Sequence, residues 1–267
     1  MTIILDGKKL SGKIASNLEG KISKLRKKPK LVIVQVGSTE ESNRYIRRKI
    51  IFGERIGAEV AHRKYPTGIT EKKLISEIGL LNSDRKIHGI IVQLPLPSHL
   101  DQGRIIGALD PVKDVDGFHG LFTPATAKGV IVMLDNYKVE IAGKKAVVVG
   151  KSELVGKPIA LALLRSGATV TVCHKQTKNL KRETIQADIL VVAAGHPKLI
   201  TKSHVKKGAV VIDVGINVLK NGKLSGDVDF KKVSKIVRAI SPVPGGIGPM
   251  TVASLFENLL EAYCLQT

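Results

Sequence analysis

The chain has 267 residues, 43% of them hydrophobic and 25% charged, a composition typical of a soluble globular protein with a sizeable core. Its 43 Lys and Arg against 23 Asp and Glu leave a formal net charge of +20, and no stretch approaches the roughly 18 consecutive apolar residues of a membrane helix. Two cysteines cannot build a disulfide framework and the first residues lack the layout of a signal peptide, so we expect a cytoplasmic protein rather than a secreted, fibrous or membrane one.

A strongly basic chain is also typical of nucleic-acid binding, because lysines and arginines contact phosphates. Here the basic residues are scattered, with the densest clusters at 24–30 and 44–49, and the chain has no Trp, five Phe and four Tyr. It contains no helix-turn-helix, zinc-finger or RNP-like pattern. We therefore expect an anionic small ligand, no nucleic acid, no membrane and no metal, and keep nucleic-acid binding as the weaker alternative.

The first 120 residues alternate helix-like and strand-like segments, which predicts a parallel sheet with covering helices. Helical periodicity covers residues 10–25, 40–56 and 70–82. Strand-like runs cover residues 31–37, 58–66 and 88–97, the last of them stopped by prolines.

A second unit begins near Thr123 and follows a βαβαβ order, which predicts a doubly wound nucleotide-binding sheet. Its expected strands are residues 144–150, 168–174, 188–195, 209–215 and 237–241. Its expected helices are residues 127–137, 155–166 and the region near 177–187; a Gly/Pro-rich loop at 244–250 precedes a last helix at 251–263.

The predicted fold class is therefore α/β, with two three-layer α/β domains and a cleft between them. The first domain is expected to comprise residues 1–122 together with the C-terminal helix 251–267. The second, residues 123–250, is expected to be Rossmann-like and to bind a nucleotide.

The first strand of the second domain ends at Gly150 and leads into a helix near Val155 and Gly156. A glycine lets the backbone approach an anion, and the free N–H groups at a helix start bind phosphate. The spacing G-x5-G is neither the G-x-G-x-x-G fingerprint nor a Walker A loop, since Lys145 stands five positions before Gly150. An ordinary tight turn between strand and helix stays an alternative.

The next strand ends in residues 172–177, where a domain that selects NAD usually carries an acidic residue for the ribose hydroxyl. This chain instead has His174 and Lys175 there, with Lys151 in the first turn. Cations at this point favour the 2′-phosphate of NADP, although solvated surface lysines would look the same.

Tyr45 and Lys49 stand four positions apart and Ser42 one turn earlier, so the three share one face of the helix predicted at 40–56. Neighbouring cations and partial burial would lower the pKa of Lys49 toward that of a usable acid or base. Gln93, beside two prolines at the end of a buried strand, is expected to face a site. The alternative for the pair is a packed ring and a solvated amine. A short-chain dehydrogenase is disfavoured, because its Tyr-x-x-x-Lys follows the nucleotide-binding strands.

Asp114 and Asp116 precede a glycine in the loop between the two units. Carboxylates in an inter-domain crevice can hold a polar heterocycle through hydrogen bonds. A metal site or a turn are the alternatives, and two aspartates alone fall short of a ligand set.

Taken together and in this order, the motifs resemble those of the methylenetetrahydrofolate dehydrogenase/cyclohydrolase family, over residues 2 to 263. The most specific of them are QLPLP, KDVDGF and PGGIGPMT. The full set is VGSTEESNRYIRRK, GIIVQLPLP, KDVDGFH, VVVGKSELVGKP, VTVCHKQT, ADILVVAAG, GAVVIDVGIN, SGDVDF and SPVPGGIGPMT.

The resemblance implies a multifunctional enzyme of one-carbon metabolism and purine biosynthesis, both oxidoreductase and hydrolase. It would oxidise 5,10-methylenetetrahydrofolate with NADP⁺ and hydrolyse the methenyl product to 10-formyltetrahydrofolate, as a homodimer joined through the nucleotide-binding domains. By motif, Lys49 resembles the family's catalytic lysine, Tyr45 the ring that stacks on folate, Gln93 its hydrogen-bonding partner and Asp116 the carboxylate that holds the pterin.

The implied catalytic residues are Lys49, Tyr45, Gln93 and Asp116. The implied substrate-binding residues are Tyr45, Ser42, Gln93, Leu94, Pro95, Asp116, Pro244, Gly245 and Gly246. The implied NADP-binding residues are Thr126, Gly150, Lys151, Ser152, Val155, Gly156, His174, Lys175, Thr177, Ala194, Gly195, Val214, Gly215 and Ile216.

Three positions depart from the family pattern: Lys151 replaces an arginine, Lys175 replaces a serine, and PATAKG at 124–129 lacks a second proline. Lysine supplies charge but not the bidentate fork that arginine offers to phosphate. Two alternatives therefore stay open beside the bifunctional enzyme. One is a member that keeps a single activity, and the other is an NADP-dependent dehydrogenase for another substrate, such as a shikimate-dehydrogenase-like enzyme.

Overall fold

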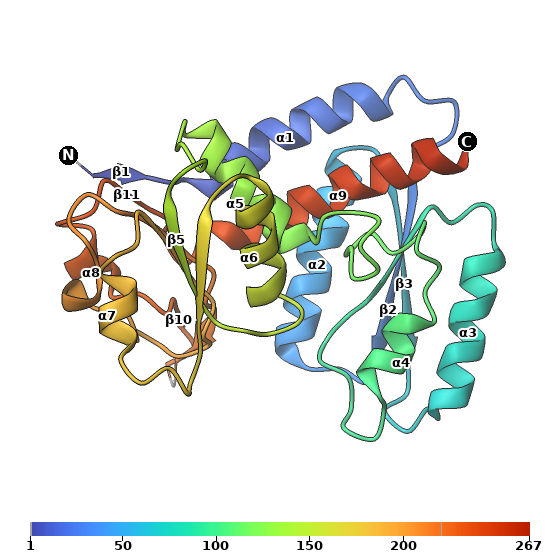
Figure 1. Ribbon diagram of the computed structural model, residues 1–267. Helices are drawn as coiled ribbons and strands as arrows, with labels where there is room; N and C mark the ends of the chain where they lie inside the picture. Colours follow the sequence, from blue (N-terminus) through green and yellow to red (C-terminus); the bar gives the residue numbers. More distant parts are fainter. Residues whose placement is uncertain (1, 220) are drawn as a thin grey trace. The chain divides into compact units, whose positions relative to one another are not determined.

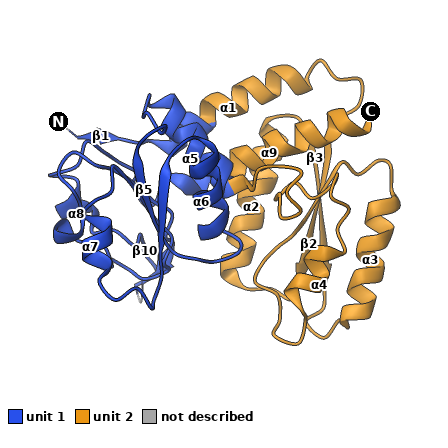
Figure 2. Cartoon of the chain, viewed as in Figure 1, with its two compact units in different colours: residues 1–11, 126–251 blue, residues 12–125, 252–267 orange. Residues whose placement is uncertain are grey.

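The computed structural model describes residues 2–219 and 221–267, and the chain forms two compact units (Figures 1 and 2). Each unit is built around its own parallel sheet. Unit 1 comprises Met1–Ser11 and Thr126–Thr251, and unit 2 comprises Gly12–Ala125 and Val252–Thr267.

The sheet of unit 2 has the strand order β3-β2-β4, with β2 (Lys30–Val36) in the middle. β3 (Glu59–Tyr65) and β4 (Gly89–Val92) both run parallel to it. The last six residues of β2 are buried, as an apolar strand must be when helices cover both faces of its sheet.

The side chains of β2 alternate between two apolar clusters, one on each face of this sheet. Leu31 and Ile33 join a cluster with helical residues of 15–22 and 252–262, whereas Val32 and Val34 join a cluster with residues of 74–81. This is the predicted three-layer arrangement. The helices that contribute to unit 2 are α1 (Gly7–Ile22), α2 (Glu40–Arg55), α3 (Glu71–Ser83), α4 (Gln102–Gly107) and α9 (Ile247–Gln266).

The sheet of unit 1 is fully parallel and has the order β1-β11-β8-β7-β5-β6. The chain builds outward from β5 in both directions, which makes the carboxyl ends of β5 and β7 the topological switch point where doubly wound sheets bind ligands. The strands are β1 (Ile3–Ile4), β5 (Lys145–Val149), β6 (Thr169–Cys173), β7 (Ile189–Val192), β8 (Val210–Asp213) and β11 (Ala239–Ile240).

Smaller elements complete unit 1. β9 (Asn217–Val218) and β10 (Leu224–Ser225) form an antiparallel pair. The helical segments are α5 (Ala125–Asn136), α6 (Gly156–Arg165), α7 (Leu180–Thr184), α8 (Phe230–Val233) and a 3-10 turn at Lys202–His204.

The α/β class and the two-domain organisation are confirmed, but the structure differs from the expected boundaries at two places. Residues 1–11 belong to unit 1, because β1 pairs in parallel with β11 as the edge strand of that sheet. The predicted loop 244–250 is half helical, because α9 already begins at Ile247. Pro249 is tolerated there since the first turn of a helix has no internal partner for its N–H groups.

Among the described residues, no helix is long and apolar enough to cross a membrane. The same described residues contain no group of three or more His, Cys, Asp or Glu side chains that could hold a metal ion.

Candidate active site

Lys49 and Gln93 meet in unit 2 although they stand far apart in sequence. Lys49 lies on α2, whose start is fixed by a capping box between Thr39 and Ser42, and Gln93 directly follows β4. The Lys49 Nζ donates a hydrogen bond of 3.0 Å to Gln93 Oε1. The Gln93 Nε2 donates in turn to the Leu94 carbonyl oxygen at 2.8 Å, so the orientation of the amide is determined.

Burial lowers the pKa of Lys49, and the negative charge of Asp116 opposes this shift by raising it. Burial likewise raises the pKa of Asp116, while Lys49 lowers it and Asp114 raises it. Lys49 and Asp116 are therefore both desolvated, and each influences the protonation of the other. An amine whose pKa is depressed in this way can gain and lose a proton closer to neutral pH than an ordinary lysine.

Tyr45 lies one turn before Lys49 and is partly buried. Burial raises the pKa of its hydroxyl, and the guanidinium of Arg48 lies 5.8 Å from its ring centroid. The ring is thus a neutral, partly exposed surface on which a flat ligand can stack.

The predicted substrate residue Ser42 is placed differently from Tyr45. It is only 6% exposed, and its hydroxyl accepts hydrogen bonds from the Gln35 amide at 2.9 Å and from the Thr39 backbone N–H at 3.2 Å. Its hydroxyl therefore fixes the first turn of α2. The buried Gln35, which is not among the predicted site residues, also contacts His62 at 2.8 Å and so links this turn to β3.

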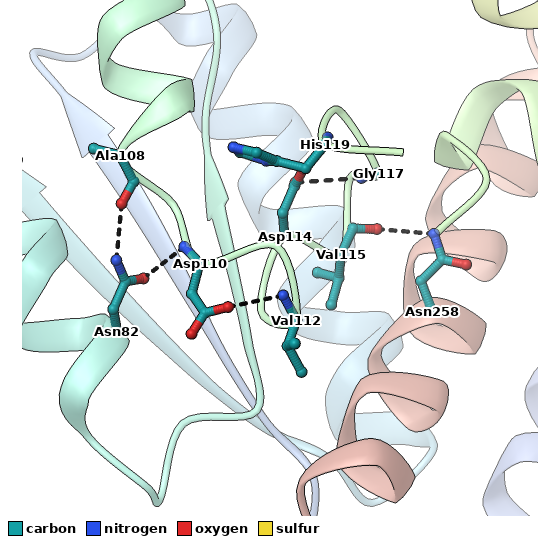
Figure 3. A network of polar contacts seen from close by, with 9 residues as sticks. All are labelled: Asn82, Ala108, Asp110, Val112, Asp114, Val115, Gly117, His119 and Asn258. Carbon is teal, nitrogen blue, oxygen red and sulfur yellow. Dashed lines mark hydrogen bonds and ion pairs between the residues drawn. The ribbon is translucent and has the colours of Figure 1, made fainter. Parts of the chain in front are cut away.

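The loop that carries Asp116 is held by polar contacts on both sides (Figure 3). Asp114 is a buried anchor: its carboxylate accepts from the backbone N–H groups of Gly117 and His119, and it lies 2.8 Å from the His119 ring nitrogen. Asn258 on α9 donates to the Val115 carbonyl oxygen at 2.9 Å. The neighbouring aspartates therefore differ: Asp114 shapes the loop through its hydrogen bonds, whereas Asp116 influences the pKa of Lys49.

In unit 1, Gly150 directly follows β5 and has φ +133°, and a Cβ at this position would lie only 2.2 Å from the Ala193 carbonyl oxygen. Only glycine fits this turn. Val155, before α6, provides no side-chain cap, while the Ser152 hydroxyl accepts from the Gly156 N–H at 3.2 Å. The start of this ten-residue helix at the switch point fits a phosphate group.

The end of β6 forms a closed turn in which His174 N–H donates to the Thr177 hydroxyl and Thr177 N–H donates to the His174 carbonyl oxygen, both at 2.9 Å. Lys151 and Lys175 are both exposed, one after β5 and one after the neighbouring β6. Two cations therefore follow adjacent strand ends at the ligand-binding edge of the sheet.

Other predicted cofactor residues have backbone N–H groups that already donate to buried carboxylates of the protein. The N–H groups of Ala194 and Gly195 donate to Asp227, and the N–H of Gly215 donates to Asp213. These residues can contact a ligand only through other atoms. Neither buried aspartate is among the predicted site residues, although both lie in motifs on which the family resemblance rests.

The remaining predicted residues have various surroundings. The Thr251 hydroxyl contacts that of Thr126 at 3.3 Å, Val214 N–H donates to the Val192 carbonyl oxygen, and Ile216 is partly exposed before β9. Leu94 and Pro95 follow β4, and Pro244, Gly245 and Gly246 precede α9.

A doubly wound sheet with a glycine turn at its switch point, together with a second α/β unit that carries a desolvated lysine, defines a two-domain nucleotide-dependent enzyme. Comparison with known proteins identifies the family of this enzyme. The chain belongs to the tetrahydrofolate dehydrogenase/cyclohydrolase family: the model of the catalytic domain matches residues 5–116 and that of the NAD(P)-binding domain matches residues 124–267.

Individual relatives agree along the whole chain. The bifunctional protein FolD of Nautilia profundicola is 45% identical, with 97% of this chain and 96% of that protein covered. The structure of the bifunctional methylenetetrahydrofolate dehydrogenase/cyclohydrolase FolD from Campylobacter jejuni has a TM-score of 0.98 and 41% identity over 100% of both chains. The Trypanosoma brucei enzyme, solved with NADP and an inhibitor, has a TM-score of 0.94 and 32% identity over 99% of this chain and 98% of its own.

The predicted family, the enzyme class with its two activities, and the nicotinamide nucleotide cofactor are thereby confirmed. The findings favour the folate enzyme over a dehydrogenase for another substrate. The roles of individual site residues stay predictions.

Proposed function

We propose that this chain oxidises 5,10-methylenetetrahydrofolate with NADP⁺ and hydrolyses the methenyl product to 10-formyltetrahydrofolate, with Lys49 as general acid and base. The observation that carries the proposal is the hydrogen bond from Lys49 Nζ to Gln93 Oε1, made by an amine whose pKa burial lowers.

Hydrolysis requires water to add to the carbon between N5 and N10, and one of these nitrogens then has to leave with a proton. The neutral Lys49 amine takes one proton from the attacking water, and the resulting ammonium donates it to the leaving nitrogen as the bond between that nitrogen and the carbon breaks. The hydroxyl of the tetrahedral intermediate loses the other proton to solvent when the formyl carbonyl forms. Gln93 accepts one N–H of Lys49 and so directs the amine toward the reacting carbon.

Oxidation depends on orientation more than on proton transfer, since positive charge develops across N5, the bridging carbon and N10 as hydride leaves. NADP⁺ supplies the acceptor for this hydride when bound. A neutral Lys49 does not oppose the developing charge. Tyr45 stacks on the folate and Asp116 hydrogen-bonds the pterin, so the methylene carbon is held in place.

The choice of NADP over NAD is assigned to Lys151 and Lys175. Both are exposed cations that follow adjacent strands, where an NAD-selective domain would carry a carboxylate. Their positive charge favours the additional phosphate of NADP.

We also propose that the protein is located in the cytoplasm. We propose further that it forms a homodimer through unit 1. β6 is the edge strand of its sheet, and an apolar surface lies beside it: Leu161 and Leu164 on α6 are 52% and 56% exposed and Val172 on β6 is 39% exposed. Such a surface next to an unpaired strand edge suits a second copy of the chain. The mass of the protein in solution tests this assembly.

The activity is tested by mixing the protein with 5,10-methylenetetrahydrofolate and NADP⁺, with NAD⁺ in a parallel cell. We expect reduction of NADP⁺ far above that of NAD⁺, and accelerated decay of separately added methenyltetrahydrofolate. Lys49→Met should reduce the decay to the rate without enzyme, while NADP⁺ still binds.

Arg47→Met is the matched control, because it removes an exposed cation from the same helix two positions away. Retained hydrolysis in Lys49→Met would remove Lys49 from its role. Methenyl decay without nucleotide reduction in the wild type would identify a cyclohydrolase alone, and neither signal from folded protein would refute the proposed function.

A further inference from the structure

Asp227 is a fully buried carboxylate that receives four hydrogen bonds in unit 1. The three consecutive backbone N–H groups of residues 194–196 donate to it at 2.7, 2.9 and 2.9 Å. The fourth donor is the Asn217 side-chain amide at 2.8 Å. Each carboxylate oxygen thus receives two hydrogen bonds, one pair from Ala194 and Gly195 and the other from His196 and Asn217.

This arrangement is an anion-binding loop that the chain fills with its own carboxylate. Successive N–H groups around a residue with φ near +64°, such as Gly195, form a concavity that attracts an anion. Burying a carboxylate is costly unless its oxygens are hydrogen-bonded, so the loop and Asp227 each require the other. The carboxylate of Asp227 therefore fixes the conformation of residues 194–196.

The position of this loop links it to the nucleotide. Only Ala193 separates residues 194–196 from the end of β7 at the switch point. The carbonyl oxygen of Ala193 packs against the Gly150 turn. Asn217, the fourth donor, begins β9 shortly after β8. Asp227 thus joins the segments that follow two adjacent strands at the edge where the sheet binds its ligand.

A second buried carboxylate holds Asp227 itself. Asp213, at the end of β8, accepts from the backbone N–H groups of Asp227 and Val228 at 3.0 and 2.9 Å, and from that of Gly215 at 3.0 Å. Its own N–H donates to the Ser241 hydroxyl at 2.8 Å. Asp227 is therefore held from β8 while it holds the loop after β7.

We propose that Asp227 is a positioning residue for NADP binding: by accepting the N–H groups of residues 194–196 and the Asn217 amide, it sets the shape of the ligand-binding edge of unit 1 without touching the nucleotide. This inference rests on the proposed function, and it extends it to a residue outside the predicted site.

The test is Asp227→Asn, measured by NADP⁺ titration calorimetry, dehydrogenase kinetics and cyclohydrolase rate. The amide replaces one carboxylate oxygen by an NH₂ group that faces two donors, so the loop loses its geometry. We expect the NADP⁺ Kd and KM to rise at least about tenfold. The KM for methylenetetrahydrofolate and the cyclohydrolase rate should stay within about twofold, because Lys49, Gln93 and Asp116 lie in unit 2.

Asp229→Asn is the matched control. It makes the same change of charge two residues away, in a residue that caps α8 by accepting the Lys232 N–H, and asparagine caps equally well. Asn217→Ala is the second variant, because it removes one donor to Asp227 and leaves the carboxylate in place; a rise of about threefold in the NADP⁺ Kd is expected.

An NADP⁺ Kd within about twofold of wild type in folded Asp227→Asn would overturn the inference. A parallel loss of cyclohydrolase activity would also overturn it, since the role would then be general stability. If Asp227→Asn does not fold, an unchanged Kd in Asn217→Ala overturns the inference. A wild type that binds NADP⁺ but does not turn over would instead refute the proposed function alone.

Discussion

Lys49 is subject to two opposing influences, since burial lowers its pKa and the charge of Asp116 raises it. The base form of a lysine is the neutral amine, so the cyclohydrolase kcat should rise with pH through an inflection below the ordinary lysine value of about 10.4. Asp116→Asn removes the charge that favours the ammonium, and the inflection should therefore move to lower pH. Rate profiles of both proteins check this, and an inflection that stays or moves upward would contradict it.

Asp116→Asn should also weaken folate binding. A charge-assisted hydrogen bond to the pterin contributes about 1.5–3 kcal/mol, so the KM for the folate should rise by about tenfold or more. The KM for NADP⁺ is the internal control, because the expected nucleotide residues of the Gly150 turn lie in unit 1. An unchanged folate KM would remove Asp116 from the binding role.

Residue type and spacing predicted part of this site but not all of it. Helical spacing places Tyr45 and Lys49 on one face, and a polar residue at a strand end marks Gln93, but their hydrogen bond joins positions 44 apart and follows only from the fold. Ser42 shares the same helical face, but its side chain belongs to the capping box with Thr39. Nothing local distinguishes the buried Asp227 from a surface aspartate, because its three backbone donors come from a loop 31 to 33 positions earlier.

At the level of elements, the strongly periodic or apolar segments were predicted within a few residues. The run at 31–37 became β2 and the amphipathic segment at 40–56 became α2. β1 was missed because two residues carry no periodicity, and tertiary pairing with β11 alone makes them a strand. The short elements α4, α8, β9 and β10 were missed for the same reason.

Lys113 connects the C-terminal end of α3 to the loop that carries Asp116. It is 5% exposed, and its ammonium donates to the carbonyl oxygens of Leu81, Asn82 and Asp84 at 3.2, 2.6 and 2.8 Å, at the C-terminal end of α3. A cation there satisfies carbonyl groups that the helix leaves unpaired and interacts favourably with the helix dipole.

Lys113→Met keeps the apolar stem and leaves these carbonyl oxygens without their donor. We expect the free energy of unfolding to fall by about 2–3 kcal/mol. The folate KM should rise as well, because the residue begins the segment that carries Asp116. Lys86→Met, an exposed lysine close by, is the control and should change neither quantity. Chemical denaturation measures the effect, and a loss below about 0.5 kcal/mol would show that the buried ammonium stabilises little.

At the level of the whole molecule, the anionic ligands of the proposed function explain the net charge of +20. NADP and folates are both anions, and an excess of positive charge raises their local concentration around the protein. The same positive field would attract nucleic acid. The strength of binding to a random duplex, and its salt dependence, therefore distinguish the two explanations. Weak duplex binding at physiological salt would dismiss the nucleic-acid alternative.

If the charge serves to attract the substrates, kcat/KM for NADP⁺ should fall about three- to tenfold between about 20 and about 200 mM salt, because exposed charges are screened over this range. The dehydrogenase kcat at saturating NADP⁺ should change less than about twofold, since bound ligand no longer depends on encounter. Steady-state kinetics across the salt series measure both quantities. A kcat/KM independent of salt would mean that the scattered lysines and arginines do not assist binding, and that local groups such as Lys151 and Lys175 attract the nucleotide alone.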